Sequence, residues 1–302
     1  KGVIIEEMKM YKDLPQRYVH DVLADLMFGD QPAGWSIIGT EQNIKSFNSK
    51  HFLDYRKKHY VASATTVIVS GSIKENEVIK KVEKLFSKIP TSKKHSKLPV
   101  KESQSKPEIK LSYKDTDQTH LVIALRTFPI LDKRMSIMRV LSAILGQGMS
   151  SRLFSKMRDE LGICYYIKTS HNPSTDHGDM TISAGVDNKR VDIGIKNILI
   201  ELKRMKDELV LDEELKKAKD YISGTTMLEL ETSDAQAEFA GYQEVLKKEI
   251  ELPEKIIKEI NKVTAEEVRD LAREVFVDKG LNLAIIGPYK DTKRFKVLLT
   301  LK

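Results

Sequence analysis

The sequence predicts an α+β protein with two related domains, in which helices pack on mostly antiparallel sheets. Three observations indicate this architecture. After residue 107, pairs of short apolar segments with strand character are followed by long runs of helical periodicity. A polar stretch at residues 90–106 separates this part from a shorter, mainly helical part. One helix–strand pattern also occurs near the end of each part.

The chain opens with a segment of helical character. Apolar residues recur at helical spacing across residues 3–28, and Pro15 predicts a break or a new start within them. Residues 29–40 are rich in turn-forming residues and therefore predict a loop. Thr40 is placed to cap a short helix that ends at Phe47.

Three further elements complete the first part. Ser49 is placed to cap a helix over residues 50–58. The apolar stretch ATTVIVSG at residues 64–71 predicts a buried strand, and residues 74–89 predict a helix. The stretch at residues 90–106 then carries two prolines, four serines and five lysines, a composition typical of a linker.

The second part is predicted to alternate strand pairs with helices. Its elements are strands at residues 107–113 and 119–127, helices at roughly 132–145 and 150–161, strands near 164–171 and 178–185, a helical series over roughly 189–276, and a closing strand at 281–287. We therefore assign residues 1–100 to the first domain, 101–106 to the linker and 107–302 to the second domain.

The repeated pattern bears on how complete the first domain is. The stretch SKHFLDYRKKHYVASATTVIVSG, from Ser49, resembles TAEEVRDLAREVFVDKGLNLAIIG, from Thr264. Each copy is a capped helix, a short connection, an apolar strand and a glycine. The second domain has about 150 residues before its copy, whereas the first has only 48. We therefore expect roughly a hundred residues of the first domain to be absent from this chain, by the rule that each repeat is one structural unit.

Composition and charge exclude several classes of protein. The net charge of +7 comes from 51 Lys and Arg against 44 Asp and Glu, and the lysines are interleaved with glutamates. Interfaces for nucleic acid cluster basic residues and add stacking aromatics, so we expect no nucleic-acid partner. The longest apolar runs, such as residues 283–286, are too short for a membrane span. The single cysteine, Cys164, excludes an internal disulfide and fits a reducing compartment, which favours a cytoplasmic protein.

The first candidate site is the carboxylate pair Glu6 and Glu7 in KGVIIEEMKM. A carboxylate on a helix can serve as a metal ligand or as a general base. An isolated pair is more often a solvated helix face, because Glu is mostly exposed in folded proteins. Taken alone, these residues favour the solvated interpretation.

A longer stretch changes that interpretation of Glu7. VIIEEMKMYKDLPQRYVHDVLADLMFGDQPAGWSIIGTEQNIKSF resembles the segment that follows the metal motif in inverzincin peptidases of the pitrilysin and mitochondrial-processing-peptidase type, in their bacterial branch. In that family two histidines of an H-x-x-E-H helix and a downstream glutamate bind zinc. The resemblance implies that Glu7 is this zinc ligand. It also implies domains with mixed, largely antiparallel sheets and helices on one face, paired around a peptide.

A second stretch carries the resemblance into the second part. GQGMSSRLFSKMRDELGICYYIKTS, at residues 146–170, resembles the family signature G-x-x-S-R-L-F-x-x-x-R-x-x-x-G-x-x-Y. The resemblance implies that Arg158 and Tyr165 are catalytic residues, which hold the substrate backbone and stabilise the oxyanion at the scissile carbonyl. Without it, Arg158 would be expected to pair with Asp159 or Glu160, and Tyr165 to pack its ring on a strand.

The metal motif itself is absent from this sequence. Its seven histidines fit neither H-x-x-E-H nor H-E-x-x-H. Catalytic zinc sites use about three protein ligands, and this chain offers at most one of those expected from the family. We therefore expect the remaining ligands and the general base to lie in an absent N-terminal segment.

The resemblance implies a zinc-dependent metalloendopeptidase that cleaves peptides or unstructured protein segments, with this chain inactive alone. A non-catalytic scaffold or partner subunit of a peptidase-like assembly stays open as the alternative. A third interpretation, an unrelated peptide-binding module, requires both resemblances to be accidental. The sequence immediately upstream separates the first two, since H-x-x-E-H there indicates a peptidase. The expected partners are a peptide substrate and either a second copy, in a homodimer, or a peptidase-like subunit.

Overall fold

A computed structural model describes residues 1–301 and contains one five-stranded sheet. β1 and β5 are parallel, and every other neighbouring pair is antiparallel. The α+β class and the mixed, largely antiparallel sheet are therefore confirmed, whereas a second sheet is not found within residues 1–301. In sheet order the strands are β1 (Glu108–Tyr113), β5 (Leu281–Gly287), β2 (Gln118–Thr127), β4 (Gly178–Asp187) and β3 (Cys164–Pro173).

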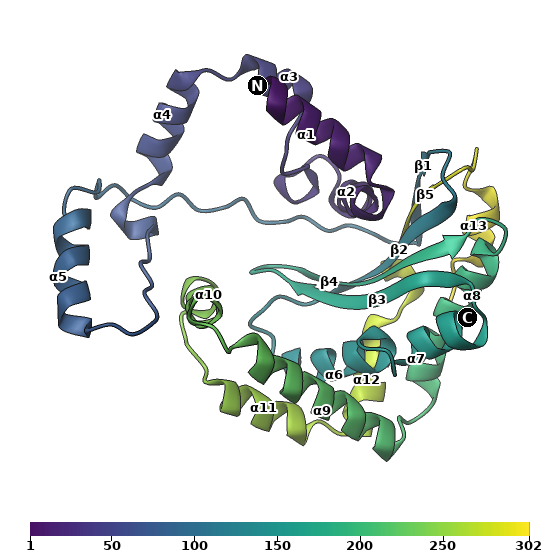
Figure 1. Cartoon of the computed structure of the whole chain (residues 1–302). Helices are drawn as coiled ribbons and strands as arrows, with labels where there is room; N and C mark the ends of the chain where they lie inside the picture. Colours follow the sequence, from purple (N-terminus) through teal and green to yellow (C-terminus); the bar gives the residue numbers. More distant parts are fainter. Residues whose placement is uncertain (302) are drawn as a thin grey trace.

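The helices that follow β2 lie mainly under one face of the sheet, the lower face in Figure 1. Their apolar stripes and the inward side chains of the strands form the larger of two hydrophobic cores. These helices are α6 (Met135–Gly146), α7 (Arg152–Phe154), α8 (Val191–Asp207), α9 (Asp212–Glu229), α10 (Ser233–Leu246), α11 (Pro253–Lys262), α12 (Ala265–Val275) and α13 (Lys293–Leu298).

Strand β2 shows how the sheet serves two cores. Leu121, Ile123 and Leu125 belong to the core under the helices, whereas Val122 and Ala124, between them, belong to a second core on the other face. Successive side chains of a strand point to opposite faces, so a strand that is buried on both faces must be apolar throughout. All five residues are fully buried.

Helix α2 (Pro15–Phe28) forms that second core, on the outer face of the sheet. Val19, Val22, Leu23 and Met27 recur at helical spacing and pack against β2 and β5. The expectation of helices on one face therefore holds for the helices after β2, while α2 covers the opposite face. This contact joins α2 to β2, about a hundred residues away, and to β5, more than 250 residues away, so local periodicity does not reveal it.

The rest of the opening segment follows the sequence prediction. The predicted helical stretch divides into α1 (Gly2–Asp13) and α2, with Pro15 at the first position of the second helix, where its missing N–H costs nothing. A short 3₁₀ turn, η1 (Pro32–Gly34), lies in the predicted loop, and Thr40 caps α3 (Glu41–Ser46). No helix within residues 1–301 has the length and apolar character needed to cross a bilayer.

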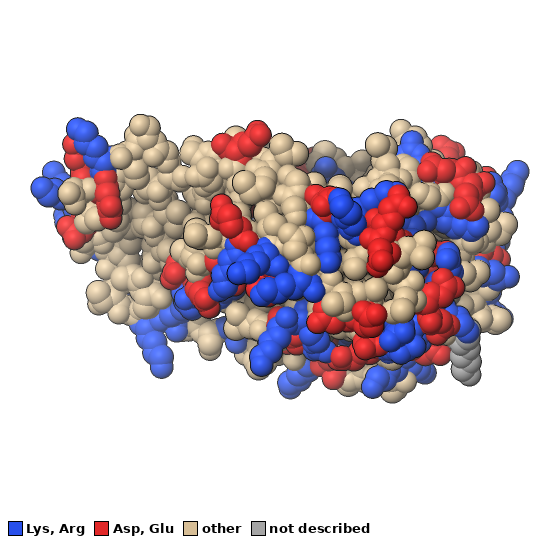
Figure 2. All heavy atoms as spheres, turned by 90° about the horizontal axis from the view of Figure 1, so that it is seen from below, with Lys and Arg blue, Asp and Glu red and all other residues tan. Residues whose placement is uncertain are grey.

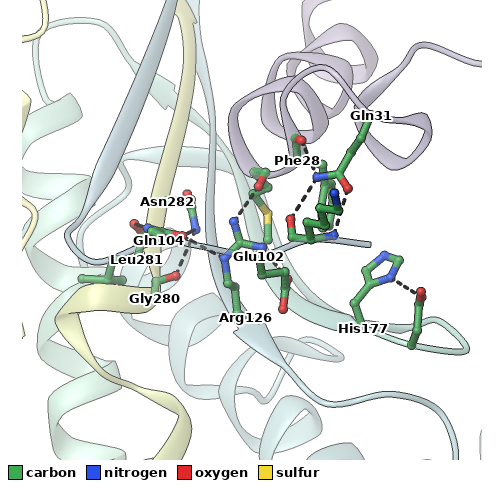
Figure 3. A network of polar contacts seen from close by, with 12 residues as sticks. Phe28, Gln31, Glu102, Gln104, Arg126, His177, Gly280, Leu281 and Asn282 are labelled. Atoms are coloured by element: carbon green, nitrogen blue, oxygen red, sulfur yellow. Dashed lines mark hydrogen bonds and ion pairs between the residues drawn. The ribbon is translucent and has the colours of Figure 1, made fainter. Parts of the chain in front are cut away.

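Arg126, near the end of β2, connects α2 to the chain that precedes the sheet (Figure 3). Its Nη2 donates to the carbonyl of Met27 at 2.5 Å, its Nε donates to the Gln104 side chain at 2.9 Å, and Nη1 pairs with Glu102. The guanidinium therefore bonds α2 and the segment before β1 at the same time. It also lies over the ring of Phe28, with 5.6 Å between the guanidinium carbon and the ring centre.

Residues 97–104 are fixed along most of their length. Gln31 exchanges two hydrogen bonds with the backbone of Lys101, both at 3.0 Å. The Asp176 carboxylate, in the β3–β4 turn, accepts from the backbone N–H of Val100 at 3.0 Å and pairs with Lys97. This part of the predicted linker is thus an ordered strap, which contacts the β3–β4 turn, the end of β2 and the start of β5.

Helices α4 (Ser49–His59) and α5 (Glu75–Phe86) stand apart from the rest, at the left of Figure 1. Neither helix buries a residue. Asn48 caps α4, so Ser49 is the first helical residue and not the predicted cap. Helix α5 lies within the predicted range, as expected.

The predicted strand at residues 64–71 is wrong: after a 3₁₀ turn, η2 (Ala62–Ala64), the segment is extended but pairs with no strand within residues 1–301. A strand exists only where a neighbour satisfies its backbone groups, and residues 66–70 lack one here. Val67, Ile68 and Val69 are therefore 40–46% exposed rather than buried.

Replacing Arg126 with Ala should loosen α2 from the sheet. The change leaves the Met27 carbonyl and Glu102 without their donor, and Gln104 Oε1 with Asn282 as its remaining donor, which should lower the free energy of unfolding by roughly 1–3 kcal/mol. Thermal unfolding measures the loss, and amide hydrogen exchange should speed up in residues 15–28. Arg269→Ala, which removes an arginine paired only with its neighbour Asp270, serves as control. Unchanged stability and exchange in Arg126→Ala would contradict the role.

Candidate functional site

Arg158 and Tyr165, predicted from the resemblance, lie side by side at the start of β3. The Arg158 Nη1 donates to the backbone carbonyl of Tyr165 at 3.2 Å. Its guanidinium carbon lies 5.7 Å from the centre of the Tyr165 ring and 5.2 Å from that of Phe154. The pair is therefore held together by one hydrogen bond and by cation–π contacts.

The chain around this pair departs from regular geometry twice. Residues 155–160, which hold Arg158, form a single π-helical turn, η3 (Ser155–Glu160), directly after α7. Gly162 then takes a left-handed φ of +57°, which suits glycine and lets the chain reverse into β3. π-turns of this kind occur often at functional sites.

The second irregularity is a β-bulge in β3 between Cys164 and Tyr166. Cys164 and Ile167, three residues apart, both belong to the core under the sheet. A regular strand alternates faces every residue and cannot place both there, so one extra residue must be inserted. That residue is Tyr165, which has no partner on β4 and whose side chain is 73% exposed.

This arrangement leaves hydrogen-bond donors free for a ligand. The Tyr165 hydroxyl forms no hydrogen bond within residues 1–301, and the Arg158 guanidinium forms only the one to the carbonyl. The alternative pairing of Arg158 with Asp159 or Glu160 is not found, since Glu160 pairs with Lys156 at 2.6 Å. Two exposed donors at the end of an edge strand can bind a peptide carbonyl or a developing oxyanion.

Glu7 lies in a different part of the molecule, on α1, and is exposed. Its neighbour Glu6 pairs with Lys9 at 2.8 Å, whereas Glu7 forms no hydrogen bond or ion pair within the described residues. No group of three or more His, Cys, Asp or Glu in residues 1–301 is arranged to hold a metal. The residues of this chain alone therefore do not fit a zinc site, and Glu7 offers a single donor.

Other histidines and arginines of the second part of the chain have structural partners. His177 bonds Asp176 at 2.8 Å, while His171 bonds the Thr127 hydroxyl at 3.2 Å, so the two histidines form no shared site. Arg152 makes a bidentate ion pair with Glu214 at 2.6 and 2.7 Å, which ties α7 to α9.

Comparison with known proteins identifies the family. Residues 46–222 match the family model described as the Peptidase M16 inactive domain. The chain belongs to the M16 peptidase family. The predicted resemblance to peptidases of this type is thereby confirmed.

Its relatives within the M16 family include zinc proteases. The chain is 32% identical over 288 residues to the uncharacterized zinc protease YmxG of Bacillus subtilis, a match that covers 95% of this chain and 69% of that protein.

Solved structures of other proteins share its fold. A protease from Helicobacter pylori has a TM-score of 0.87 at 19% identity, covering 95% of this chain and 71% of its own. A chain of complex III from Candida albicans has a TM-score of 0.88 at 17% identity, and the match covers 99% of this chain and 74% of that chain.

Cys164, next to the candidate pair, should be chemically inert. Burial raises the pKa of its thiol to about 11, with Arg158 opposing the shift, so the thiol stays neutral until the pH approaches that value. Since only the thiolate reacts, iodoacetamide at pH 8 should modify the folded chain roughly 100-fold more slowly than the unfolded chain. The chain has one cysteine, so intact mass reports this reaction alone. Equal rates in both states would contradict its burial.

Proposed function

We propose that this M16 chain takes part in a zinc-dependent metalloendopeptidase that cleaves peptides or unstructured protein segments. The observation that carries the proposal is the exposed pair of Arg158 and Tyr165 at the bulged start of β3, in a chain related to zinc proteases. Its thiol, Cys164, is free, which supports action in a reducing compartment such as the cytoplasm.

In this proposal the pair binds the substrate at the carbonyl to be cleaved. The Tyr165 hydroxyl donates to the oxygen on which negative charge develops, and the Arg158 guanidinium holds a neighbouring backbone carbonyl. The carbonyl of Tyr165 and the Phe154 ring orient the guanidinium before substrate arrives, so little ordering is needed on binding.

The proposal includes a domain organisation in which residues 1–100 are part of a metal-bearing domain, joined through residues 101–106 to the second domain at 107–302. Its support is the exposed apolar surface of the arm formed by α4, α5 and residues 64–71. Val67, Val69 and Ile73 face Val78 and Ile79 of α5 across an open cavity of about 290 Å³. Polypeptide outside residues 1–302 would cover this surface by pairing with the extended segment.

Zinc would then be held by ligands from two sources. Glu7 would contribute one carboxylate oxygen, and the polypeptide that completes the domain would contribute the other ligands and the general base. When bound, the metal would polarise the scissile carbonyl and lower the pKa of a water nucleophile. The chain alone would be inactive, since one carboxylate does not retain zinc.

A second candidate function is that of a non-catalytic scaffold or partner subunit. The observation that favours it is that no three-donor metal group occurs in residues 1–301, in a family domain described as inactive. In that case the exposed arm would bind a peptidase-like subunit or a second copy of the chain. Related subunits occur in assemblies, as the complex III chain from Candida albicans illustrates.

Arg158→Ala and Tyr165→Phe should each lower turnover in the complete enzyme while bound zinc stays unchanged. Removing one donor to an oxyanion costs roughly 100-fold in kcat. Peptide cleavage and metal content measured on the same sample separate the two effects. Arg294→Ala is a matched control, because Arg294 also lies over two aromatic rings but contacts α8, and Tyr113→Phe is the control for the phenol. Unchanged kinetics in both site variants would remove their role.

Glu7→Gln should abolish zinc binding and turnover together in the complete enzyme, because the amide is a far weaker ligand than the carboxylate. Zinc content by atomic absorption is the direct measurement. Glu6→Gln, one residue away and paired with Lys9, should retain both zinc and activity. Full activity in Glu7→Gln would exclude Glu7 as a ligand, and loss in both variants would indicate damage to α1.

A further inference from the structure

The outer face of the sheet carries a cavity that the proposed chemistry does not use. It measures about 650 Å³ and lies between the first turn of α2 and strands β2, β3 and β4. Arg17 and His20 border it from α2, and His120, Tyr166 and Lys168 border it from the sheet. We refer to it as the outer-face basin.

The charge of this basin is one-sided. Arg17 and Lys168 line it, no Asp or Glu does, and neither cation forms an ion pair or side-chain hydrogen bond within residues 1–301. On the helical face, by contrast, lysines and arginines are interspersed with acids (Figure 2). Both side chains are exposed, and two unpaired cations that border one cavity create a local positive potential that attracts an anion.

The opposite side of α2 shows the contrast. A cavity of about 790 Å³ there is lined by Asp21, Asp25 and Asp30, and Lys110 from β1 also lines it and pairs with Asp25. Trp35 donates its indole N–H to Asp30 at 2.8 Å. On that side of α2, Asp25 and Asp30 therefore have partners that pair with them or donate to them. On the basin side, no acidic residue pairs with the cations within residues 1–301.

Neutral hydrogen-bond groups complete the basin. His120 and the Tyr166 hydroxyl are 3.1 Å apart, and His20 and the Ser183 hydroxyl 3.4 Å apart. Burial lowers the pKa of both histidines, so near neutral pH they act as neutral donors or acceptors. Burial raises the pKa of Tyr166 to about 12, which keeps its hydroxyl protonated and able to donate.

We propose that the outer-face basin binds the carboxylate of an acidic residue in a peptide, with Lys168 and Arg17 as its counter-ions. The inference deepens the proposed function, on which it rests, by naming the substrate class. Lys168 lies three residues after Tyr165 on β3, about 10 Å at 3.3 Å per residue. A peptide extended along β3 would therefore carry its Asp or Glu about three residues from the carbonyl held at Tyr165.

No local sequence pattern predicts this basin, because its cations come from segments far apart in the chain. Arg17 lies in the first turn of α2 and Lys168 in β3, and only the packing of α2 on the sheet brings them to one cavity. The family signature quoted above specifies neither residue, because the last position of its pattern is Tyr165 and Lys168 lies beyond it.

Fluorescence anisotropy of two labelled, unstructured peptides tests the inference on the 302-residue chain. The two peptides have the same sequence, except that one carries a Glu at the position where the other carries a Gln. The Glu peptide should bind roughly tenfold more tightly. Lys168→Gln and Arg17→Gln should each reduce this preference about three- to fivefold, the upper range for exposed ion pairs. Lys203→Gln, an exposed lysine on α8 without a partner within residues 1–301, should change nothing.

Each outcome bears on one proposal. Equal binding of the two peptides, or a preference that survives the Lys168→Gln, Arg17→Gln double variant, would overturn the basin while leaving the turnover test of Arg158 and Tyr165 intact. Competition by free glutamate at the same carboxylate concentration as the peptide would also overturn it, in favour of a small-anion site. A Glu preference that persists in Arg158→Ala and Tyr165→Phe supports the basin, whatever those variants do to turnover.

Discussion

The packing of α2 on the outer face of the sheet is the contact on which the rest of the structure depends. It converts β2 and β5 into strands buried on both faces, and β5 is buried at every position from Leu281 to Gly287. Arg126 reinforces the contact, because its guanidinium bonds the end of α2 and the strap before β1 together. Through this contact α1, which carries Glu7, belongs to the same body as β3, which carries Tyr165.

The candidate site depends on irregular backbone rather than on regular elements. The π-turn places Arg158 beside β3, and the bulge moves Tyr165 out of the pairing with β4. Both deviations follow from packing: Met157, inside the turn, and Cys164 and Ile167, on either side of the bulge, must all reach one core. The core thereby fixes the position of two side chains that are themselves exposed.

The sequence predicted elements whose determinants are local. The closing strand has its predicted bounds, 281–287, because a mainly apolar run between Gly280 and Gly287, with Asn282 as its one polar residue, leaves little freedom. Thr264 caps α12 in a capping box with Glu267, a signal contained within four residues. The placement of α2 and the bulge at Tyr165 could not be predicted in this way, since each depends on contacts with distant strands. Arg158 and Tyr165 are candidates through the family resemblance alone, since without it Arg158 is expected to pair with a neighbouring acid and Tyr165 to pack its ring on a strand.

The two copies of the helix–strand pattern differ in burial, and this difference shows which features depend on the local sequence and which on neighbouring elements. In the second copy, α12 buries Val268, Leu271 and Val275, and the strand after it is the fully buried β5. In the first copy, α4 buries nothing, and residues 64–71 are extended and exposed, although Ile68 lies against Gly241 of α10.

The local pattern is the same in both copies, so it determines the helix and the extended chain but not burial. Burial and strand pairing come from the layer beside each copy, which the second copy has in β1, β2 and the helices, and which residues 1–301 do not supply to the first. The exposed arm therefore presents an apolar face that no layer within residues 1–301 covers, and exposed apolar surface of this kind is typical of interaction surfaces.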